Sequence, residues 1–484
     1  MDIRWANIKA AEHVGNPTFV DNKGFHAMHL KFKVPLIHPN ARETKNTDFL
    51  TLQADLVYER RDNSFPPPSS DSLKTTLQGI VSRRTLLVYL CGGPGAANPA
   101  FENDEFNTWF IDREQPILYL NYRGTDEQTC PKEGSSAKDL VYFRQDAIVA
   151  DLEAIRLCLD KNLNKNPDKK LQYRLFGQSF GGWIALTALS FTPGGLKDVM
   201  ITAGMAPVKS SPDEVYEALY KPVIKANEVY YGEYPQDKER VKTIVEWLAK
   251  QNDDKGVQLP DKQRLTARGF LTMGRWFGRE KDGRKEVHKF VKMIAEDIDG
   301  SHGIKQESIK QFATADGAGF KLDKRPLYAV LHELIYCHGP GVVSNWAAQR
   351  VGRQQAGDHF AWLNDDFDFN NVRNAGLLYF SGEMIYEFML DDAGPNMQPL
   401  IQAAKDLAQK NDWPALYDKE QLHKNKVPVK VMSFQGDMYV DTELAEITAG
   451  MIGSCARIKP QPGWSHRSIK KHTNEVLAEF ERNE

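Results

Sequence analysis

The sequence predicts an α/β fold, with a mostly parallel sheet, helices on both of its faces and an inserted helical cap. Over residues 1–207, short apolar runs typical of buried strands alternate with segments of helical periodicity. From 208 to 395, helical periodicity, charge and aromatic residues dominate and strand signals are few. Strand and helix signals alternate again within 396–484. We therefore expect a core formed by residues 1–207 and 396–484, with residues 208–395 as the cap.

Length and composition favour a large soluble enzyme. The chain has 484 residues, more than one small domain needs, which suits a large enzyme with an insertion or a protein of two to three domains. Its 41% hydrophobic and 26% charged residues are ordinary for a globular protein. A net charge of -3 gives no electrostatic reason to expect nucleic acid or an anionic membrane as a partner.

The five cysteines lack the spacing of a disulfide framework or a zinc site, so we expect neither a metal nor another cofactor. Their odd number suits a reducing compartment. Residues 1–9 lack the apolar run of a signal peptide, and no apolar stretch is long enough to cross a membrane. These features predict a cytoplasmic protein without a membrane partner, and they leave the oligomeric state open.

The first half of the chain contains signals for edge strands, central strands and a crossover helix. Residues 26–35 and 49–59 alternate apolar and polar side chains, which predicts an antiparallel edge. The run 85–90 is continuously apolar, as in a buried parallel strand, and 116–122 is predicted as the next strand. Apolar residues at helical spacing over 146–159 predict an amphipathic helix.

The second half of the core repeats this alternation. Strands are predicted at 198–204, 427–434 and 456–459, and helices at 442–451 and 467–481. Strand–helix–strand order implies parallel strands joined by helices on both faces of the sheet.

The most informative stretch is Gly177-Gln178-Ser179-Phe180-Gly181, a G-x-S-x-G motif. A β-prone run, 172–176, precedes it, and small apolar residues at helical spacing, 184–191, follow it. In an ordinary glycine-containing turn the motif would be a coincidence, whereas a preceding strand and a following helix indicate the nucleophile elbow of an α/β-hydrolase. The predicted fold class is therefore an α/β-hydrolase fold with an inserted helical cap.

A glycine-rich turn, Cys91-Gly92-Gly93-Pro94-Gly95, directly follows the predicted strand 85–90. Glycines there allow backbone N–H groups to approach a ligand closely. In an α/β-hydrolase this turn supplies the second N–H of the oxyanion hole. The alternative is an ordinary loop, and the missing Gly-Lys-Ser/Thr ending excludes a phosphate loop.

The candidate catalytic residues are Ser179, Asp437 and His466, each just past a predicted strand. They follow one another in the order of α/β-hydrolase triads. Serine needs a base to take its proton, histidine is that base near neutral pH, and aspartate orients the imidazole. Asp441 competes with Asp437 but fits a helix N-terminus, and His472 competes with His466 but lies within the predicted closing helix.

These residues resemble those of the proline iminopeptidases, which are serine exopeptidases of the α/β-hydrolase fold, and in particular the larger fungal and actinobacterial type. The resemblance covers most of the chain and involves the segments Gly92-Gly93-Pro94-Gly95, Tyr122-Arg123-Gly124-Thr125, Gly177-Gln178-Ser179-Phe180-Gly181-Gly182, Pro326-Leu327-Tyr328-Ala329-Val330-Leu331-His332-Glu333, Gly382-Glu383-Met384-Ile385-Tyr386 and Asp437-Met438-Tyr439-Val440-Asp441.

The resemblance implies release of N-terminal proline from small peptides with a free N-terminus. It also implies that Ser179 attacks the carbonyl of that proline, with the N–H groups of Gly93 and Phe180 as the oxyanion hole. The cap glutamates that best match the family's amine-binding residues are Glu333 and Glu383. A carboxylate in a water-poor pocket would recognise the substrate ammonium strongly.

Two departures from the family concern loop geometry and substrate specificity. Cys91 stands where the family usually has histidine, and the segment after Arg123-Gly124 lacks the family's second glycine and serine. Two other functions stay open: hydrolysis of another amide or an ester, and a binding role on an inactive hydrolase fold. The intact set of serine, aspartate and histidine argues against the second.

Overall fold

A computed structural model describes most of the chain. The described residues are 8–22, 24–38, 48–60, 85–99, 104–131, 134–163, 170–253, 255–279, 282–301, 303–314, 325–355 and 357–482, with Trp5, Leu77 and Ile80. Most of the N-terminal segment in which no signal peptide is expected lies outside them.

Ten strands form one sheet in the described part of the chain, in the order β1-β3-β4-β6-β5-β7-β8-β11-β12, with β2 paired to β3. Their bounds are β1 Glu12–His13, β2 Thr18–Asn22, β3 Phe25–Pro35, β4 Phe49–Arg60, β5 Thr85–Leu90, β6 Ile117–Leu120, β7 Gln172–Gln178, β8 Leu196–Thr202, β11 Val429–Met432 and β12 Cys455–Ile458. Strands β6, β5, β7, β8, β11 and β12 pair in parallel in that order, and β1 to β4 form an antiparallel edge that joins them through β4 and β6. The predicted mixed sheet is therefore confirmed.

Helices flank this sheet: α3 Asp104–Ile111, α5 Gln145–Leu163, α6 Phe180–Phe191, α18 Thr442–Met451, α19 Ser468–Lys471 and α20 Thr473–Arg482. Every side chain of α6 is buried, which explains its small apolar sequence. The prediction of one closing helix over 467–481 is wrong. The backbone leaves helical geometry at His472, with φ -133° and ψ 44°, and α20 begins at the next residue.

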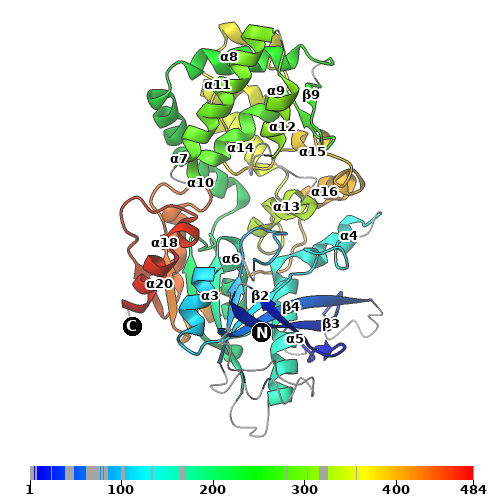
Figure 1. Cartoon of the computed structure of the whole chain (residues 1–484), viewed down its shortest axis with the longest axis vertical. Coiled ribbons are helices and arrows are strands. Elements are labelled where there is room, and N and C mark those ends of the chain that lie inside the picture. Colours follow the sequence, from blue (N-terminus) through cyan, green and yellow to red (C-terminus); the bar gives the residue numbers. More distant parts are fainter. Residues whose placement is uncertain are drawn as a thin grey trace.

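The chain between β8 and β11 is mainly helical (Figure 1). Its helices are α7 Pro212–Glu233, α8 Asp237–Ala249, α9 Ala267–Leu271, α10 Arg275–Arg279, α11 Gly283–Ser301, α12 Gln306–Thr314, α13 Pro326–Leu331, α14 Ala347–Gln355, α15 Phe388–Asp391, α16 Ile401–Ala408 and α17 Lys419–His423. A short hairpin, β9 Val257–Gln258 and β10 Arg264–Leu265, interrupts them. In Figure 1, α7, α8, α9, α11 and α12 gather at one end of the molecule, away from the sheet.

The domain boundaries at 207/208 and 395/396 stay a prediction, and α16 and α17 lie between the second boundary and β11. Among the described residues, no helix combines the length and the apolar character needed to cross a membrane.

Candidate active site

Ser179 lies at a sharp turn between β7 and α6, with φ 54° and ψ -126°. Such a backbone is rare for a residue with a side chain and is held only where the surroundings impose it. The Ser179 N–H donates to the carbonyl of Thr202 at 3.1 Å, which ties the turn to the end of β8. Gly181 lets α6 pack closely, because an added Cβ would lie 2.0 Å from the carbonyl oxygen of Leu90.

Hydrogen bonds connect the three predicted catalytic side chains. Nε2 of His466 lies 3.1 Å from Oγ of Ser179, and Nδ1 of His466 lies 2.8 Å from Oδ2 of Asp437. The other carboxylate oxygen of Asp437 accepts from the backbone N–H groups of Tyr439 and Val440 at 2.8 and 3.3 Å. His466 and Asp437 are buried, so solvent competes little for these bonds.

The electrostatic surroundings shift the pKa of His466 upward. Burial opposes the charged imidazolium, but the charge and hydrogen bond of Asp437 and the charge of Glu383 outweigh it. A raised pKa favours a base that can hold a proton during a reaction step.

The two competing residues have other partners. Asp441 is the N-cap of α18, and its Oδ1 accepts from the Leu444 N–H at 2.9 Å. His472 lies at the break between α19 and α20 and stacks on Trp464. The geometry around Ser179 therefore supports Asp437 and His466 over these alternatives.

The glycine-rich turn after β5 lies against the serine. A Cβ added at Gly92 would be 3.1 Å from Cβ of Ser179, so the turn packs against the predicted nucleophile. Gly93 is the next residue of this turn. Phe180 is the first residue of α6, where backbone N–H groups have no partner one turn earlier in the helix. These positions suit the two predicted oxyanion-hole donors.

Glu383 lies close enough to the histidine and aspartate for their charges to affect one another. Burial raises the pKa of Glu383, and the negative charge of Asp437 adds to this effect, whereas His466 opposes it. The Tyr328 hydroxyl, from α13, donates to Oε1 of Glu383. Glu383 is a half-buried residue, whereas Gly382 and Met384 on either side of it are buried.

Glu333, by contrast, is only 4% exposed and binds the start of a helix. Its two carboxylate oxygens accept from the N–H groups of Ala347 and Ala348 at 3.1 and 2.9 Å, at the N-terminus of α14. Burial outweighs these bonds and raises the pKa of Glu333 to about 8. Its role in substrate binding stays a prediction.

The Glu333→Gln variant is expected to be less stable by about 1–3 kcal/mol at pH 5, because the side-chain NH₂ would face a backbone N–H. The stability difference between the variant and the wild type should shrink as pH rises. Between the ordinary pKa of 4.5 and about 8, the folded protein holds a proton on Glu333 that the unfolded chain has lost. Wild-type stability therefore falls across this window, whereas glutamine does not titrate.

Urea unfolding of both proteins at pH 5, 6, 7 and 8 would measure this difference. Glu420→Gln is a matched control, because the Glu420 side chain is 87% exposed in α17 and should leave the pH dependence unchanged. A difference between Glu333→Gln and wild type that stays constant with pH would contradict the shifted pKa.

Three site residues were not identified from the sequence: Tyr328, Tyr439 and Arg275. Tyr439 stacks on His466, with ring centroids 4.4 Å apart, and Arg275 is close enough for its charge to lower the pKa of Glu383. The two tyrosines occur in segments that resemble the family, but no sequence signal distinguishes Arg275.

Cys91, which replaces the histidine expected from the family resemblance, is buried at the start of the glycine-rich turn. Its Sγ lies 3.5 Å from the carbonyl oxygen of Ala96, and burial raises its pKa to about 11. The thiol is therefore protonated near neutral pH and is a poor nucleophile.

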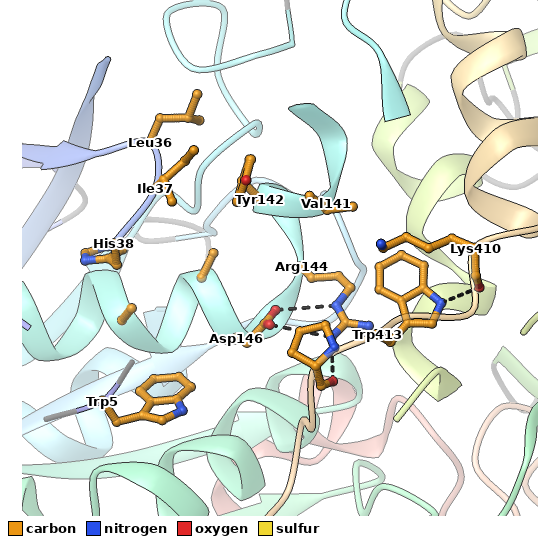
Figure 2. A pocket seen from close by; sticks show the side chains of 13 residues that line it. Trp5, Leu36, Ile37, His38, Val141, Tyr142, Arg144, Asp146, Lys410 and Trp413 are labelled. Carbon is orange, nitrogen blue, oxygen red and sulfur yellow. Dashed lines mark hydrogen bonds and ion pairs between the residues drawn. The ribbon is translucent and has the colours of Figure 1, made fainter. Parts of the chain in front are cut away.

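A pocket of about 260 Å³ lies elsewhere, between α5 and the segment containing Trp413, and its lining includes none of the predicted site residues (Figure 2). Its charged groups are paired within the chain. Arg144 bonds to Asp146 and to the carbonyls of Cys337 and Pro414, and it lies over the Trp413 ring. Arg144 therefore joins the start of α5 to the segments that contain Cys337 and Pro414.

The order of strands in the sheet and the serine turn between β7 and α6 define an α/β-hydrolase-fold protein. No protein-family model matches the chain. A proline iminopeptidase of Aeromonas sobria is 33% identical over 407 residues, which span 81% of this chain and 85% of that protein. One of Aspergillus aculeatus is 29% identical over 400 residues, spanning 81% and 83%. The chain belongs to the proline iminopeptidase family, and it is an enzyme, a serine hydrolase.

Among solved structures, the proline iminopeptidase of Mycobacterium smegmatis aligns over 89% of this chain and 94% of its own, with 13% identity and a TM-score of 0.38. An esterase from Exiguobacterium antarcticum aligns over 90% and 96%, with 13% identity and a TM-score of 0.35.

Proposed function

We propose that this enzyme is a serine exopeptidase that releases N-terminal proline, or a similar residue, from peptides through an acyl-enzyme on Ser179. The observation that carries the proposal is the connected chain of Ser179, His466 and Asp437 with the half-buried Glu383 beside it. The first three groups supply acyl-transfer chemistry, and the fourth supplies a reason to select a free amino terminus.

Acylation begins when Oγ of Ser179 attacks the carbonyl carbon of the first substrate residue. Nε2 of His466 takes the hydroxyl proton, and Asp437 stabilises the resulting imidazolium. The N–H groups of Gly93 and Phe180 donate to the oxyanion of the tetrahedral intermediate. When the intermediate collapses, His466 gives its proton to the leaving amine, and the shortened peptide departs.

Deacylation repeats these steps with water. His466 removes a proton from the water, whose oxygen attacks the acyl carbon and forms a second oxyanion in the same hole. Collapse breaks the ester bond, Ser179 recovers its proton from His466, and the free amino acid leaves.

Recognition of the amino terminus is assigned to Glu383. A substrate ammonium beside it would add a charge-assisted hydrogen bond to a carboxylate that otherwise accepts from the Tyr328 hydroxyl and, among the described residues, has no cationic partner within bonding distance. Glu333 has both oxygens occupied by backbone N–H groups, so in this proposal it supports the site by holding the start of α14. Substrates are small peptides with free N-termini.

The cytoplasm is the proposed location. In the described part of the chain all five cysteines are free, which suits a reducing compartment.

Chromogenic amides of proline, alanine and leucine, each with a free and a blocked N-terminus, test the proposal beside a short-chain ester. We expect turnover of the free proline amide and at least a 100-fold lower kcat/KM for its blocked form, because the blocked form lacks the ammonium partner of Glu383. Ester turnover without amide cleavage would retain the triad and reject the peptidase. No turnover of any of these substrates by folded protein would reject the proposed exopeptidase.

A further inference from the structure

We infer that Tyr439 is a positioning residue that holds the imidazole of His466 and connects it to helix α10. The inference rests on the proposed triad but not on the identity of the substrate. Its structural basis is a set of three contacts that Tyr439 makes, one with His466, one with Asp437 in its own loop and one with α10.

The first contact is with His466. The two rings stack with centroids 4.4 Å apart and planes inclined by 19°, and both residues are largely buried. Stacked rings attract each other, and an aromatic face also favours a positively charged partner. Tyr439 therefore restricts the tilt of the imidazole and stabilises the imidazolium that forms during catalysis.

The second contact is with Asp437. The Tyr439 backbone N–H donates to Oδ1 of Asp437 at 2.8 Å, whereas Oδ2 binds His466. The same residue therefore orients the carboxylate through its main chain and the imidazole through its ring. A substitution of the side chain leaves the first of these interactions in place.

The third contact is with α10. The Tyr439 hydroxyl donates to the carbonyl of Arg275, the first residue of that helix. The helix also packs tightly on this loop, because a Cβ added at Gly278 would lie 3.0 Å from Cβ of Met438 and 3.1 Å from Cε2 of Tyr439. In Figure 1, α10 lies on the side of the helical region between β8 and β11 that faces α18. The position of α10 is thereby transmitted to the catalytic base through one side chain.

Two variants separate these contacts. Tyr439→Phe keeps the ring over His466 and removes the hydroxyl that donates to α10, whereas Tyr439→Leu removes both ring and hydroxyl and keeps much of the apolar volume. Tyr234→Leu is a matched control, because Tyr234 stacks on His288 with centroids 4.0 Å apart. His288 belongs to α11, which lies toward the end of the molecule away from the sheet (Figure 1).

The main measurement is the rate at which a fluorophosphonate labels Ser179 as a function of pH. In this reaction Oγ bonds to phosphorus, the P–F bond breaks, fluoride leaves and His466 takes the serine proton. The rate requires neutral His466 but no particular peptide substrate. The charged groups that act on His466 are Asp437, Glu383 and Arg467, and all three are unchanged in the variants.

For Tyr439→Leu we expect labelling and kcat to fall about 10- to 100-fold with KM nearly unchanged, because the base is misplaced. The acidic limb of its pH profile should move down by about half a pH unit, because the imidazolium loses its aromatic partner. Tyr439→Phe should lose at most about 5-fold and keep the limb in place. Tyr234→Leu should match wild type.

Labelling of Tyr439→Leu at the wild-type rate with an unmoved limb would overturn the inference. An equal loss in Tyr234→Leu would also overturn it, because the effect would then be a general loosening of the fold. Failure of the probe to label folded wild-type protein would reject the triad and this inference together. If wild type is labelled but no proline amide is cleaved, only the proposed substrate is rejected, and the Tyr439 comparison still stands.

Discussion

Replacing Ser179 by alanine is expected to reduce kcat by about 10⁵- to 10⁶-fold on any substrate that the enzyme turns over, because the remaining groups offer no nucleophile. The loss should appear in kcat with little change in KM, since alanine removes only Oγ. The fold should persist, because the turn at Ser179 is held by backbone contacts that alanine retains. Steady-state kinetics with circular dichroism would measure both properties.

Two further serine variants make this prediction specific. Ser190→Ala changes a buried serine in α6, the helix that follows Ser179. The Ser190 hydroxyl donates to the carbonyl of Leu186, and the variant should keep full activity. Ser179→Gly should be as inactive as Ser179→Ala yet about 1 kcal/mol more stable, because glycine tolerates a φ of 54° without strain. Turnover retained by folded Ser179→Ala would reject the proposed acyl-enzyme.

The parts of the fold that could be predicted are those with local signals. The elbow combines a strand, a short motif and a helix within about twenty residues, and the edge strands β3 and β4 show clear alternation. The order of Ser179, Asp437 and His466 along the chain then indicated which acid and base to test. Hydrogen bonding in the structure supports that selection.

The remaining features depend on contacts between distant segments. Glu383 and Tyr328 meet through packing of the helical region, and nothing near either residue in the sequence indicates the other. The backbone partners of Glu333 likewise become apparent only when α14 is placed beside it. The break at His472 was missed because the apolar periodicity of residues 467–481 continues through a residue that leaves helical geometry. Periodicity reports which face is buried but does not locate every interruption.

Replacing Glu383 by glutamine is expected to lower kcat/KM for a proline amide with a free N-terminus by about 100- to 1000-fold. The substrate ammonium would lose its charged partner. For an uncharged short-chain ester the loss should stay below about 5-fold, because that substrate has no ammonium to bind. Glutamine keeps an oxygen that can accept the Tyr328 hydroxyl, so the local structure should survive.

Glu387→Gln provides the matched control, because Glu387 is four residues further along the chain and pairs with Lys405 at 3.5 Å on a partly exposed surface. It should change kcat/KM for neither the amide nor the ester.

The ester also reports on electrostatics, since the negative charge of Glu383 helps to raise the pKa of His466. Removing that charge lowers this pKa, so the acidic limb of the ester profile should move to lower pH in Glu383→Gln and stay in place in Glu387→Gln. Equal losses on amide and ester would show that Glu383 supports the catalytic base alone, and amine recognition would then have to be assigned to another residue.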